Sequence, residues 1–475
     1  MRGKKGTLQR EKTVEKQKGV KETETFADLI GYVADRIKEE YDWQYGGFKS
    51  VPKFLMPETL ELMQAALVYQ GGSWDELMEH AFHSMYQGEI YDKEEGGFFR
   101  YSTEKDWSKP RFEKMLKENS QMLYVILNYY KITGDEFYAK ISREILSYLE
   151  KNLYLSSEQA WAASQHASEG YYTLPLQERK EKEPPIVDTT VYVGSNAFLV
   201  RSLFLAAAVL LEPRWFDLAV STLKTLEENC YRPGKGMSHY LLEGEKSGQL
   251  WGLLENQVAM GRALSAAFQY TGKDNYLETA RQLAKYCLEN FTVYDGSLSH
   301  SPLDSEEEMK DGFPLASVVE NAYCARWFVE MAALTGEDAY LEKAADIIHA
   351  FLDRKRELDL VEGASLALAA LEAREPAVVI DVVGKPEDDA LLPLHNAAVT
   401  AFIPPKVVRL YSPQKAAALE DKEYKSIKQA TAFIKLGKRQ LELADSPEEV
   451  EEIIQNLLQE RRAHVLFTVK ESSHI

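Results

Sequence analysis

Cysteine is rare in this chain, with three residues (Cys230, Cys287 and Cys324) among 475. They are widely spaced and odd in number, so we expect reduced, buried thiols and no disulfide framework. Nowhere do ~18 apolar residues follow one another, so no membrane span is predicted. The opening segment is charged and has no apolar stretch, which excludes a Sec signal and predicts a disordered basic arm over residues 1–24. These absences together indicate a cytoplasmic protein.

Positive charge is also in deficit. The chain has 56 Lys and Arg against 75 Asp and Glu, a net charge of −19, and outside the N-terminus no basic stripe interrupts it. Such a chain repels polyanions, so nucleic acid and anionic membranes are excluded as partners. Phosphate-binding GxxxxGK[ST], nucleotide-binding GxGxxG and nucleophile-elbow GxSxG motifs are absent. His80 and His83 have no third ligand at a suitable spacing, so neither a metal nor another cofactor is expected.

Helical periodicity dominates most of the chain. The stretch from residue 338 to 354 shows it clearly, because its apolar residues fall on one face of a helix. The expected helices are 25–40, 57–70, 73–88, 113–131, 135–154, 194–211, 213–229, 251–270, 273–291, 316–334, 338–354 and 361–373.

The links between these helices alternate between short and long, and three of the short links are variants of one turn. Gly134, Gly272 and Gly336 each follow a threonine and precede an acidic residue and a tyrosine. Glycine supplies a left-handed C-cap, and the acid starts the next helix. The spacing of the turns indicates a helical hairpin of ~60 to 70 residues that repeats along the chain.

The long links precede every second helix, and most carry glycine beside aromatic residues, as in GGF at 46–48 and GGFF at 96–99. In an array of hairpins these loops lie at one end, over the N-termini of one set of helices. Six hairpins can close into an (α/α)6 toroid over residues 25–375, with the more apolar helices inside. The fold is therefore predicted to be mainly α, with an open solenoid as the alternative.

Beyond Pro376 the pattern changes to β-branched runs. Strands are expected at 377–384, 406–411, 430–436 and 464–469, and a helix with a Ser cap at 446–462. Residues 376–475 are therefore predicted to form a small α/β subdomain.

The N-termini of the inner helices create a positive end that favours anionic or hydroxyl-rich ligands. The long loops bring aromatic and charged side chains to this end. Aromatic rings stack on the apolar faces of a sugar while charged groups bind its hydroxyls, so a sugar-binding pocket is predicted here. The residues expected to bind substrate are Lys53, Phe54, Arg100, Tyr101, Arg111, Phe112, Lys114, Tyr192, Asn196, Gln257 and Asn321.

Carboxylates recur near the starts of the inner helices, and two histidines lie in the loops before them. Glu113, Glu255 and Glu320 are candidate acids and bases for glycosidic chemistry, because facing carboxylates in a cleft can differ in pKa. His239 and His300 are candidate epimerase bases, because imidazole titrates near neutrality. The alternative is that each glutamate only complements the helix dipole and that each histidine is structural.

Six segments carry a family resemblance: GGFKSVPKF (46–54), GGFFRYSTEKDWSKPRFEKMLKEN (96–119), ASQHASEGYYTL (163–174), VDTTVYVGSNA (187–197), LLENQVAM (253–260) and VVENAYCA (318–325). They resemble the thioredoxin-domain-containing YyaL / spermatogenesis-associated protein 20-like family. The resemblance implies a helical region similar to the six-hairpin toroids of N-acylglucosamine 2-epimerases.

The chain also departs from this family. The family carries a thioredoxin-like domain ahead of the GGF motif, whereas residues 1–45 contain no CxxC, so redox chemistry is not expected here. Arg111 stands where the family has histidine, Glu118 where it has aspartate, and His166 opens the stretch that replaces Asp-Ala-Asp. A histidine-to-arginine change removes a group that exchanges protons near pH 7.

Two functions remain open from the sequence. The first is a sugar-active enzyme, an epimerase, isomerase or glycoside hydrolase, that works in the toroid mouth. The second is a binding or scaffold protein that has lost activity and acts with a separate thioredoxin-like partner.

Overall fold

The helices alternate between an inner and an outer set around one axis. The structure, a computed structural model, describes residues 25–302, 317–418, 424, 429–437 and 439–463. The predicted arm at 1–24 and the predicted strand at 464–469 therefore lie outside the described residues. The inner helices are α2 (Pro57–Gln70), α4 (Leu116–Thr133), α8 (Val193–Val209), α10 (Leu254–Thr271), α12 (Val318–Thr335) and α14 (Leu360–Arg374).

The outer helices each precede or follow an inner one in an antiparallel hairpin. They are amphipathic, as in the helix whose buried face is formed by Tyr340, Ile347 and Phe351. The inner helices, in contrast, are buried on most sides and carry few charges. The outer set consists of residues 25–40, α3 (Ser73–Gln87), α5 (Glu136–Asn152), α9 (Arg214–Cys230), α11 (Asp274–Asn290) and α13 (Asp338–Leu352).

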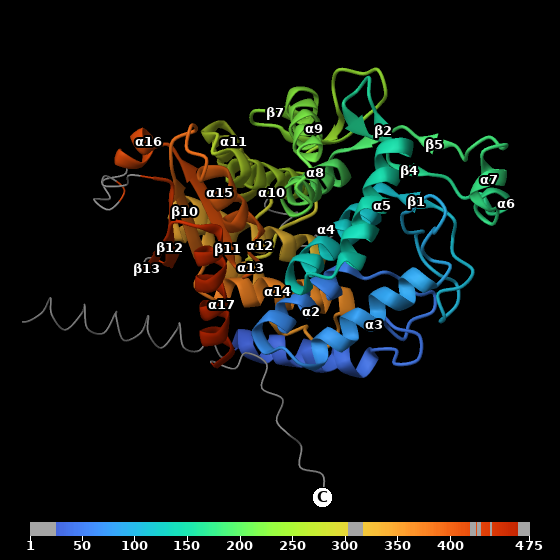
Figure 1. The fold of residues 1–475 in the computed structure, drawn as a ribbon, viewed down its shortest axis with the longest axis horizontal. Coiled ribbons are helices and arrows are strands. Elements are labelled where there is room, and N and C mark those ends of the chain that lie inside the picture. Colours follow the sequence, from blue (N-terminus) through green and yellow to red (C-terminus); the bar gives the residue numbers. More distant parts are fainter. Residues whose placement is uncertain (1–24, 303–316, 419–423, 425–428, 438, 464–475) are drawn as a thin grey trace, which may run out of the picture.

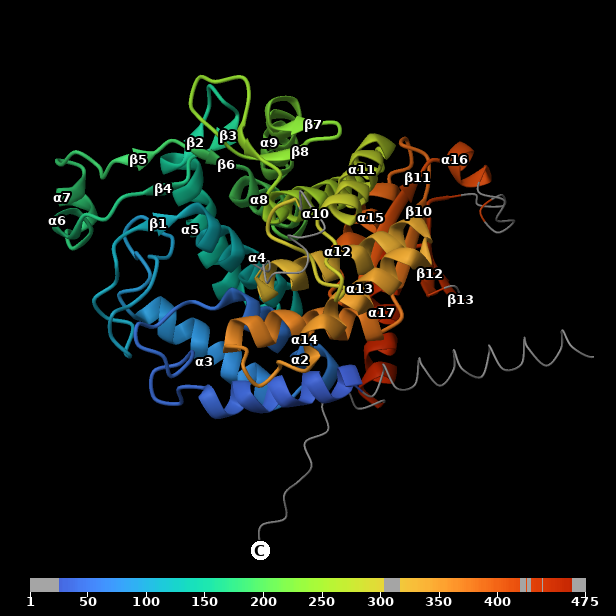
Figure 2. The ribbon, with the colours of Figure 1, turned by 180° about the vertical axis from the view of Figure 1, so that it is seen from behind.

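The inner helices form a closed ring. Each packs against the next in chain order, and α14 packs against α2, which closes the circle (Figure 2). The predicted (α/α)6 toroid is therefore confirmed, and the open solenoid is excluded. No described helix is both long enough and apolar enough to cross a bilayer.

The short turns have the predicted geometry. Gly134, Gly272 and Gly336 end α4, α10 and α12 with φ of 71°, 66° and 76°, and each N–H donates to the carbonyl four residues earlier. Only glycine adopts this left-handed conformation without a steric cost.

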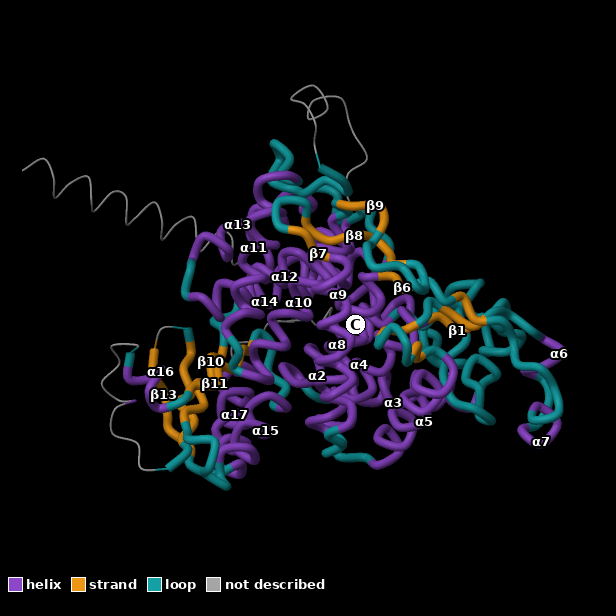
Figure 3. Tube along the Cα trace, turned by 90° about the horizontal axis from the view of Figure 1, so that it is seen from above, coloured by secondary structure: helices purple, strands orange, loops and turns teal. Residues whose placement is uncertain are grey.

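The long loops gather at the end of the ring where the inner helices begin, as predicted. They form short strands that Figure 3 shows apart from the C-terminal sheet. These loop elements are β1 (Lys114–Met115), β2 (Tyr154–Leu155), β3 (Ala160–Trp161), β4 (Ser164–Gln165), α6 (Glu169–Tyr172), α7 (Leu176–Arg179), β5 (Val187–Asp188), β6 (Val191–Tyr192), β7 (Tyr231–Arg232), β8 (Gly236–Leu241) and β9 (Gln249–Trp251).

The start of α4 differs from the prediction. The helix begins at Leu116 rather than at 113, because Lys114 and Met115 are extended and pair with Gln165 and Ser164 of β4. Tertiary strand pairing here overrides the helical pattern of the local sequence.

The C-terminal part covers the opposite end of the ring (Figure 1). Its sheet has the order β11-β10-β12-β13, with β10 and β11 parallel and the other neighbours antiparallel. Helix α15 contacts α8, β11 contacts α10 and α12, and α17 contacts α2. Helices α15 and α16 and strand β13 were not predicted. The elements are β10 (Val378–Val383), α15 (Leu391–Thr400), β11 (Lys406–Tyr411), α16 (Pro413–Ala417), β12 (Thr431–Leu436), β13 (Arg439–Ala444) and α17 (Pro447–Ala463).

Candidate functional site

Two cavities lie inside the ring. The mouth pocket, of about 500 Å³, is lined by the N-terminal halves of α2, α4, α8, α10 and α12. The inner cavity, of about 170 Å³, is lined by the remaining parts of all six inner helices and by residues 399–407 of the C-terminal part. The mouth pocket has the size of a small-molecule site, and it lies where the sequence predicted one.

His239 and Glu255 form the first acid–base pair of the mouth pocket. His239 lies on β8, Glu255 lies in the first turn of α10, and Nδ1 is 3.2 Å from Oε1. The ring of Tyr192 meets the imidazole edge to face at 5.2 Å. The hydrogen bond to Glu255 raises the pKa of His239, and the same bond lowers the pKa of Glu255.

His300 and Glu320 form a second pair, in which Glu320 on α12 lines the mouth pocket, whereas His300 precedes that helix and is not among the lining residues. Nδ1 of His300 is 3.3 Å from Oε2 of Glu320, which lies in the first turn of α12. Burial raises the pKa of Glu320 against the opposing effect of His300, and the negative charge of Glu255 raises it further.

Glu58 is a third carboxylate in this pocket. Gln121 Nε2 donates to its Oε1 at 2.7 Å, and the Tyr323 hydroxyl donates to the same oxygen at 3.3 Å. Burial raises the pKa of Glu58. The pocket thus holds one carboxyl group with a lowered pKa, Glu255, together with two that have raised pKa values, Glu58 and Glu320. Such divergent carboxylates can act as base and acid in one reaction.

Glu113 is not in the mouth pocket. It precedes α4 instead of lying in its first turn, and its Oε2 accepts a hydrogen bond from Arg100 Nη1 at 3.0 Å. The ring centroids of Phe54 and Tyr101 are 5.1 Å apart, and the ring of Phe112 stacks on that of Tyr172. Arg111 is exposed. None of these predicted site residues is among the residues that line the pocket, because each lies in the loops that precede α2 and α4.

The predicted ligands Lys53 and Lys114 instead hold the loops together. Both are fully buried. Lys53 Nζ lies 2.7 Å from Asp42 Oδ2, and Lys114 Nζ lies 2.6 Å from Asp92 Oδ2. Each ammonium also donates to a backbone carbonyl. Both ammonium groups are thus buried in contacts within the loops, and neither lysine lines the mouth pocket.

The predicted ligands Asn196, Gln257 and Asn321 form a repeated structural contact, here called the amide clamp. Each lies three residues after the first residue of its inner helix. Its side-chain oxygen accepts the N–H of one loop residue, and its NH2 group donates to the carbonyl of that same residue. The clamped residues are Trp161, Met237 and Leu298, and Asn119 holds Phe98 in the same way.

Two of these clamps place the histidines. Gln257 holds Met237 on β8, two residues before His239, and Asn321 holds Leu298, two residues before His300. The side chains of Gln257 and Asn321 therefore fix the loop backbone next to the two histidines, and neither lines the mouth pocket.

Sequence reasoning missed the polar residues that line the pocket from the inner helices: Lys117, Gln121, Asn256, Arg201, Arg262 and Tyr323. One signal was present. Arg201, Arg262 and Arg326 occupy the same position, eight residues after the first residue of α8, α10 and α12, in otherwise apolar helices.

In the part of the chain that the structure describes, the side chains form neither a cluster of metal ligands nor a disulfide. No three His, Cys, Asp or Glu side chains there are placed to share a metal ion. All three cysteines are buried and unpaired.

A closed ring of six helical hairpins with a polar pocket at its mouth defines the class of an (α/α)6 toroid protein. The spermatogenesis-associated protein 20 of Mus musculus is 32% identical over 182 residues, which cover 35% of this chain and 23% of that protein. The match therefore spans less than a quarter of the relative's length. It confirms the family resemblance that the sequence segments carry.

Solved structures agree on the fold. The cellobiose 2-epimerase of Spirochaeta thermophila has a TM-score of 0.60 at 14% identity, and covers 74% of this chain and 96% of its own. The GH76 α-mannanase of Bacteroides thetaiotaomicron has a TM-score of 0.55 at 12% identity, with coverages of 74% and 95%. These similarities show the (α/α)6 architecture that sugar-processing enzymes of both kinds share. No family model matches the chain.

Proposed function

We propose that this protein is a carbohydrate-active enzyme that moves a proton on the carbon beside the carbonyl of a reducing sugar, as epimerases and isomerases do. The observation that carries the proposal is the pairing of His239 with Glu255 and of His300 with Glu320 on adjacent inner helices. Two imidazoles, each beside a carboxylate, supply one base and one acid for a transfer near neutral pH.

The reaction needs no group beyond these pairs. One neutral imidazole removes the proton from C2 of the open-chain sugar, and the electron pair moves toward the carbonyl oxygen to give an enediolate. The other histidine, which starts as imidazolium, donates a proton. Donation to the opposite face of C2 re-forms the C1 carbonyl and inverts C2, whereas donation to C1 with transfer of the O2 proton to O1 gives the ketose. Proton exchange with solvent then returns both imidazoles to their starting states.

A glycoside hydrolase is the second candidate. It is favoured by the opposite pKa shifts of Glu255 and Glu320 in one pocket. Glu320 would protonate the leaving oxygen and Glu255 would activate water or act as the nucleophile. The family departures at Arg111, Glu118 and His166 lie outside the pocket lining, which weakens the case for a protein that only binds its ligand or a thioredoxin-like partner.

The experiment is an NMR assay of the full chain in D2O with a panel of reducing mono- and disaccharides. An epimerase or isomerase incorporates deuterium at C2 or C1, whereas a hydrolase releases new reducing ends without that label. We expect His239→Asn and His300→Asn to reduce the exchange at least a hundredfold. The matched control is His83→Asn, because His83 also lies beside a carboxylate (Glu79, 3.8 Å) but on the outer helix α3.

A panel without deuterium incorporation or bond cleavage would refute the enzymatic proposal. Thermal stabilisation by one of the sugars in that case would support the binding protein, and stabilisation only by a thioredoxin-like protein would support the scaffold.

A further inference from the structure

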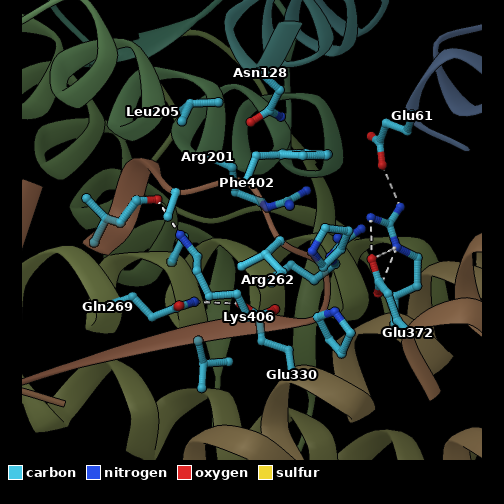
Figure 4. Close-up of a pocket in the computed structure, with 18 of the residues that line it drawn as sticks. Glu61, Asn128, Arg201, Leu205, Arg262, Gln269, Glu330, Glu372, Phe402 and Lys406 are labelled. Carbon is cyan, nitrogen blue, oxygen red and sulfur yellow. Dashed lines mark hydrogen bonds and ion pairs between the residues drawn. The ribbon is translucent and has the colours of Figure 1, made fainter. Parts of the chain in front are cut away.

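The inner cavity contains buried positive charge that the proposed proton transfer does not use. Arg201, Arg262 and Lys406 line it together with Glu330 (Figure 4). Arg201 and Arg262 also line the mouth pocket, so they lie at the junction of the two cavities. A ligand that enters through the mouth can therefore reach these two guanidinium groups.

Arg326, at the equivalent position of α12, has a guanidinium that is fully paired with carboxylates and serves as a comparison for the other two arginines. Arg326 Nη1 lies 2.7 Å from Glu61 Oε2, and its Nε lies 3.1 Å from both carboxylate oxygens of Glu372. Both glutamates are buried. Two carboxylates thus bind one guanidinium directly, whereas Glu61 acts on Arg201 and Arg262 only at longer range.

Arg262 has no such compensation. Its side chain is buried, with the residue 6% exposed, and its Nε and Nη1 have no hydrogen-bond partner. The ring of Tyr323 lies 5.2 Å from its guanidinium carbon. A buried polar group without a partner costs free energy, and a charged one costs more. Among the described residues, Arg262 therefore lacks a negatively charged hydrogen-bond acceptor for its Nε and Nη1.

Arg201 also lines both cavities, and it is partly buried. Its Nη2 meets only the Tyr124 hydroxyl at 3.4 Å, and its guanidinium stacks on the rings of Tyr124 and Phe198. Among the described residues, no carboxylate lies within ion-pair distance of Arg201 or Arg262. The two like charges repel each other, and burial together with Arg201 and Arg326 lowers the pKa of Arg262 to about 10.

Among the described residues, Glu330 forms an ion pair with neither arginine. It accepts a hydrogen bond from Gln269 Nε2 at 2.7 Å, and burial raises its pKa. Lys406 Nζ donates to the carbonyls of Ala398 and Val399, and burial lowers its pKa to about 7. Glu330 and Glu61 attract Arg262 only at longer range, and the repulsion from Arg201 and Arg326 exceeds that attraction.

We propose that Arg201 and Arg262 form an oxyanion-binding site for a phosphate, sulfate or carboxylate group at the floor of the mouth pocket. A planar guanidinium offers paired N–H donors that match the oxygens of such groups. The oxyanion is either a free ion or an acidic group on the sugar in the mouth pocket, and the recognition chemistry is the same. This site goes beyond the proposed proton transfer, since binding an anion requires neither His239 nor His300.

The test is calorimetric titration of the full chain with inorganic phosphate at constant ionic strength. We expect saturable binding that Arg262→Met weakens at least tenfold. Arg201→Met serves the same purpose should Arg262→Met fold poorly. The matched control is Arg374→Met, which should keep the wild-type Kd. Arg374 also has Nε and Nη1 without hydrogen-bond partners, but it lines neither cavity.

A comparison of inorganic phosphate, a hexose 6-phosphate and the neutral hexose identifies the source of the anion. Binding of the sugar phosphate at least tenfold tighter than either component supports an acidic sugar, and equal binding of phosphate and sugar phosphate supports a free ion. Absence of saturable binding by phosphate and sugar phosphate, or unchanged affinity in both Arg262→Met and Arg201→Met, would overturn the site. His239→Asn should keep the phosphate affinity even where it abolishes turnover.

Discussion

His239 Nδ1 lies 3.2 Å from Glu255 Oε1, and the two residues come from different parts of the fold. Glu255 is fixed in the first turn of an inner helix, whereas His239 is delivered by a loop strand. The same division holds for Glu320 and His300. The ring therefore supplies the carboxylates, the loops supply the imidazoles, and the amide clamps of Gln257 and Asn321 join the two.

The first prediction concerns the origin of the raised pKa of His239. Because Glu255 is the main cause of that shift, Glu255→Gln should lower the pKa of His239. An NMR titration of the imidazole carbon-bound protons measures it. Glu79→Gln on the outer helix should leave the His239 titration unchanged. An unaltered His239 pKa in Glu255→Gln would show that the two groups do not interact in solution.

The same pair predicts how stability depends on pH. The pKa of His239 is raised in the folded state. Its contribution to the free energy of unfolding is therefore complete below its unfolded pKa of about 6.5, and it is lost as pH rises through its folded pKa. The pKa of Glu255 is lowered in the folded state, so its contribution to the free energy of unfolding is complete above its unfolded pKa of about 4.3 and is lost as pH falls through its folded pKa. Urea midpoints of the parent chain and His239→Asn should therefore differ most between these two unfolded values and converge at alkaline pH. A difference between the two urea midpoints that grows above pH 8 would contradict the predicted direction of this pH dependence.

The amide clamps predict a separation of stability from activity. Asn321→Ala leaves the buried N–H and C=O of Leu298 unpaired, and Asn196→Ala does the same to Trp161. Each change should cost roughly 2 to 6 kcal/mol of unfolding free energy, at about 1 to 3 kcal/mol for each buried group. Urea denaturation measures this cost, and the exposed Asn275→Ala should stay within about 0.5 kcal/mol of the parent.

Turnover by the folded fraction then distinguishes the two clamps. Asn321→Ala should reduce it, because the clamped Leu298 sets the position of His300. Asn196→Ala should not, since Trp161 precedes no catalytic candidate. Equal turnover in both variants would mean that His300 is positioned by other contacts or takes no part.

The sequence predicted the ring well because its signals are local. Helical period, the threonine–glycine turns and the alternation of loop lengths each act over a few residues, and no distant contact is needed to interpret them. The predicted start of α4 was wrong because it depends on a distant contact. Lys114 and Met115 pair with β4, some fifty residues later in the chain. A helical pattern cannot reveal such a strand.

A pocket does lie at the helix N-termini, but only some of the candidate residues line it. Glu255, Glu320, His239 and Tyr192 do, because helix N-termini and their loops must meet there. Asn196 and Gln257 bind loop backbone instead, and a buried amide near a helix start looks the same in sequence whether it binds a loop or a ligand. Arg201 and Arg262 were missed because their helices are apolar on nearly every side. The hydrophobic periodicity of such a helix does not indicate which face points into the ring.

The last prediction concerns the buried ion pairs that hold the rim loops. Asp92 lies 2.6 Å from Lys114 Nζ and 2.7 Å from Arg179 Nη1, and all three are buried. Burial lowers the pKa of Lys114 to about 8, against the pull of Asp92. Asp92→Ala would remove the ion-pair partner of buried Lys114 and leave Arg179 paired with Glu95 alone, so we expect a loss of roughly 3 to 5 kcal/mol of unfolding free energy. The exposed pair of Glu104 and Lys109 provides the control, and Glu104→Ala should leave the urea midpoint unchanged. Equal midpoints for Asp92→Ala and Glu104→Ala would show that the rim is held by its backbone pairing and aromatic packing, with no net contribution from the buried charges.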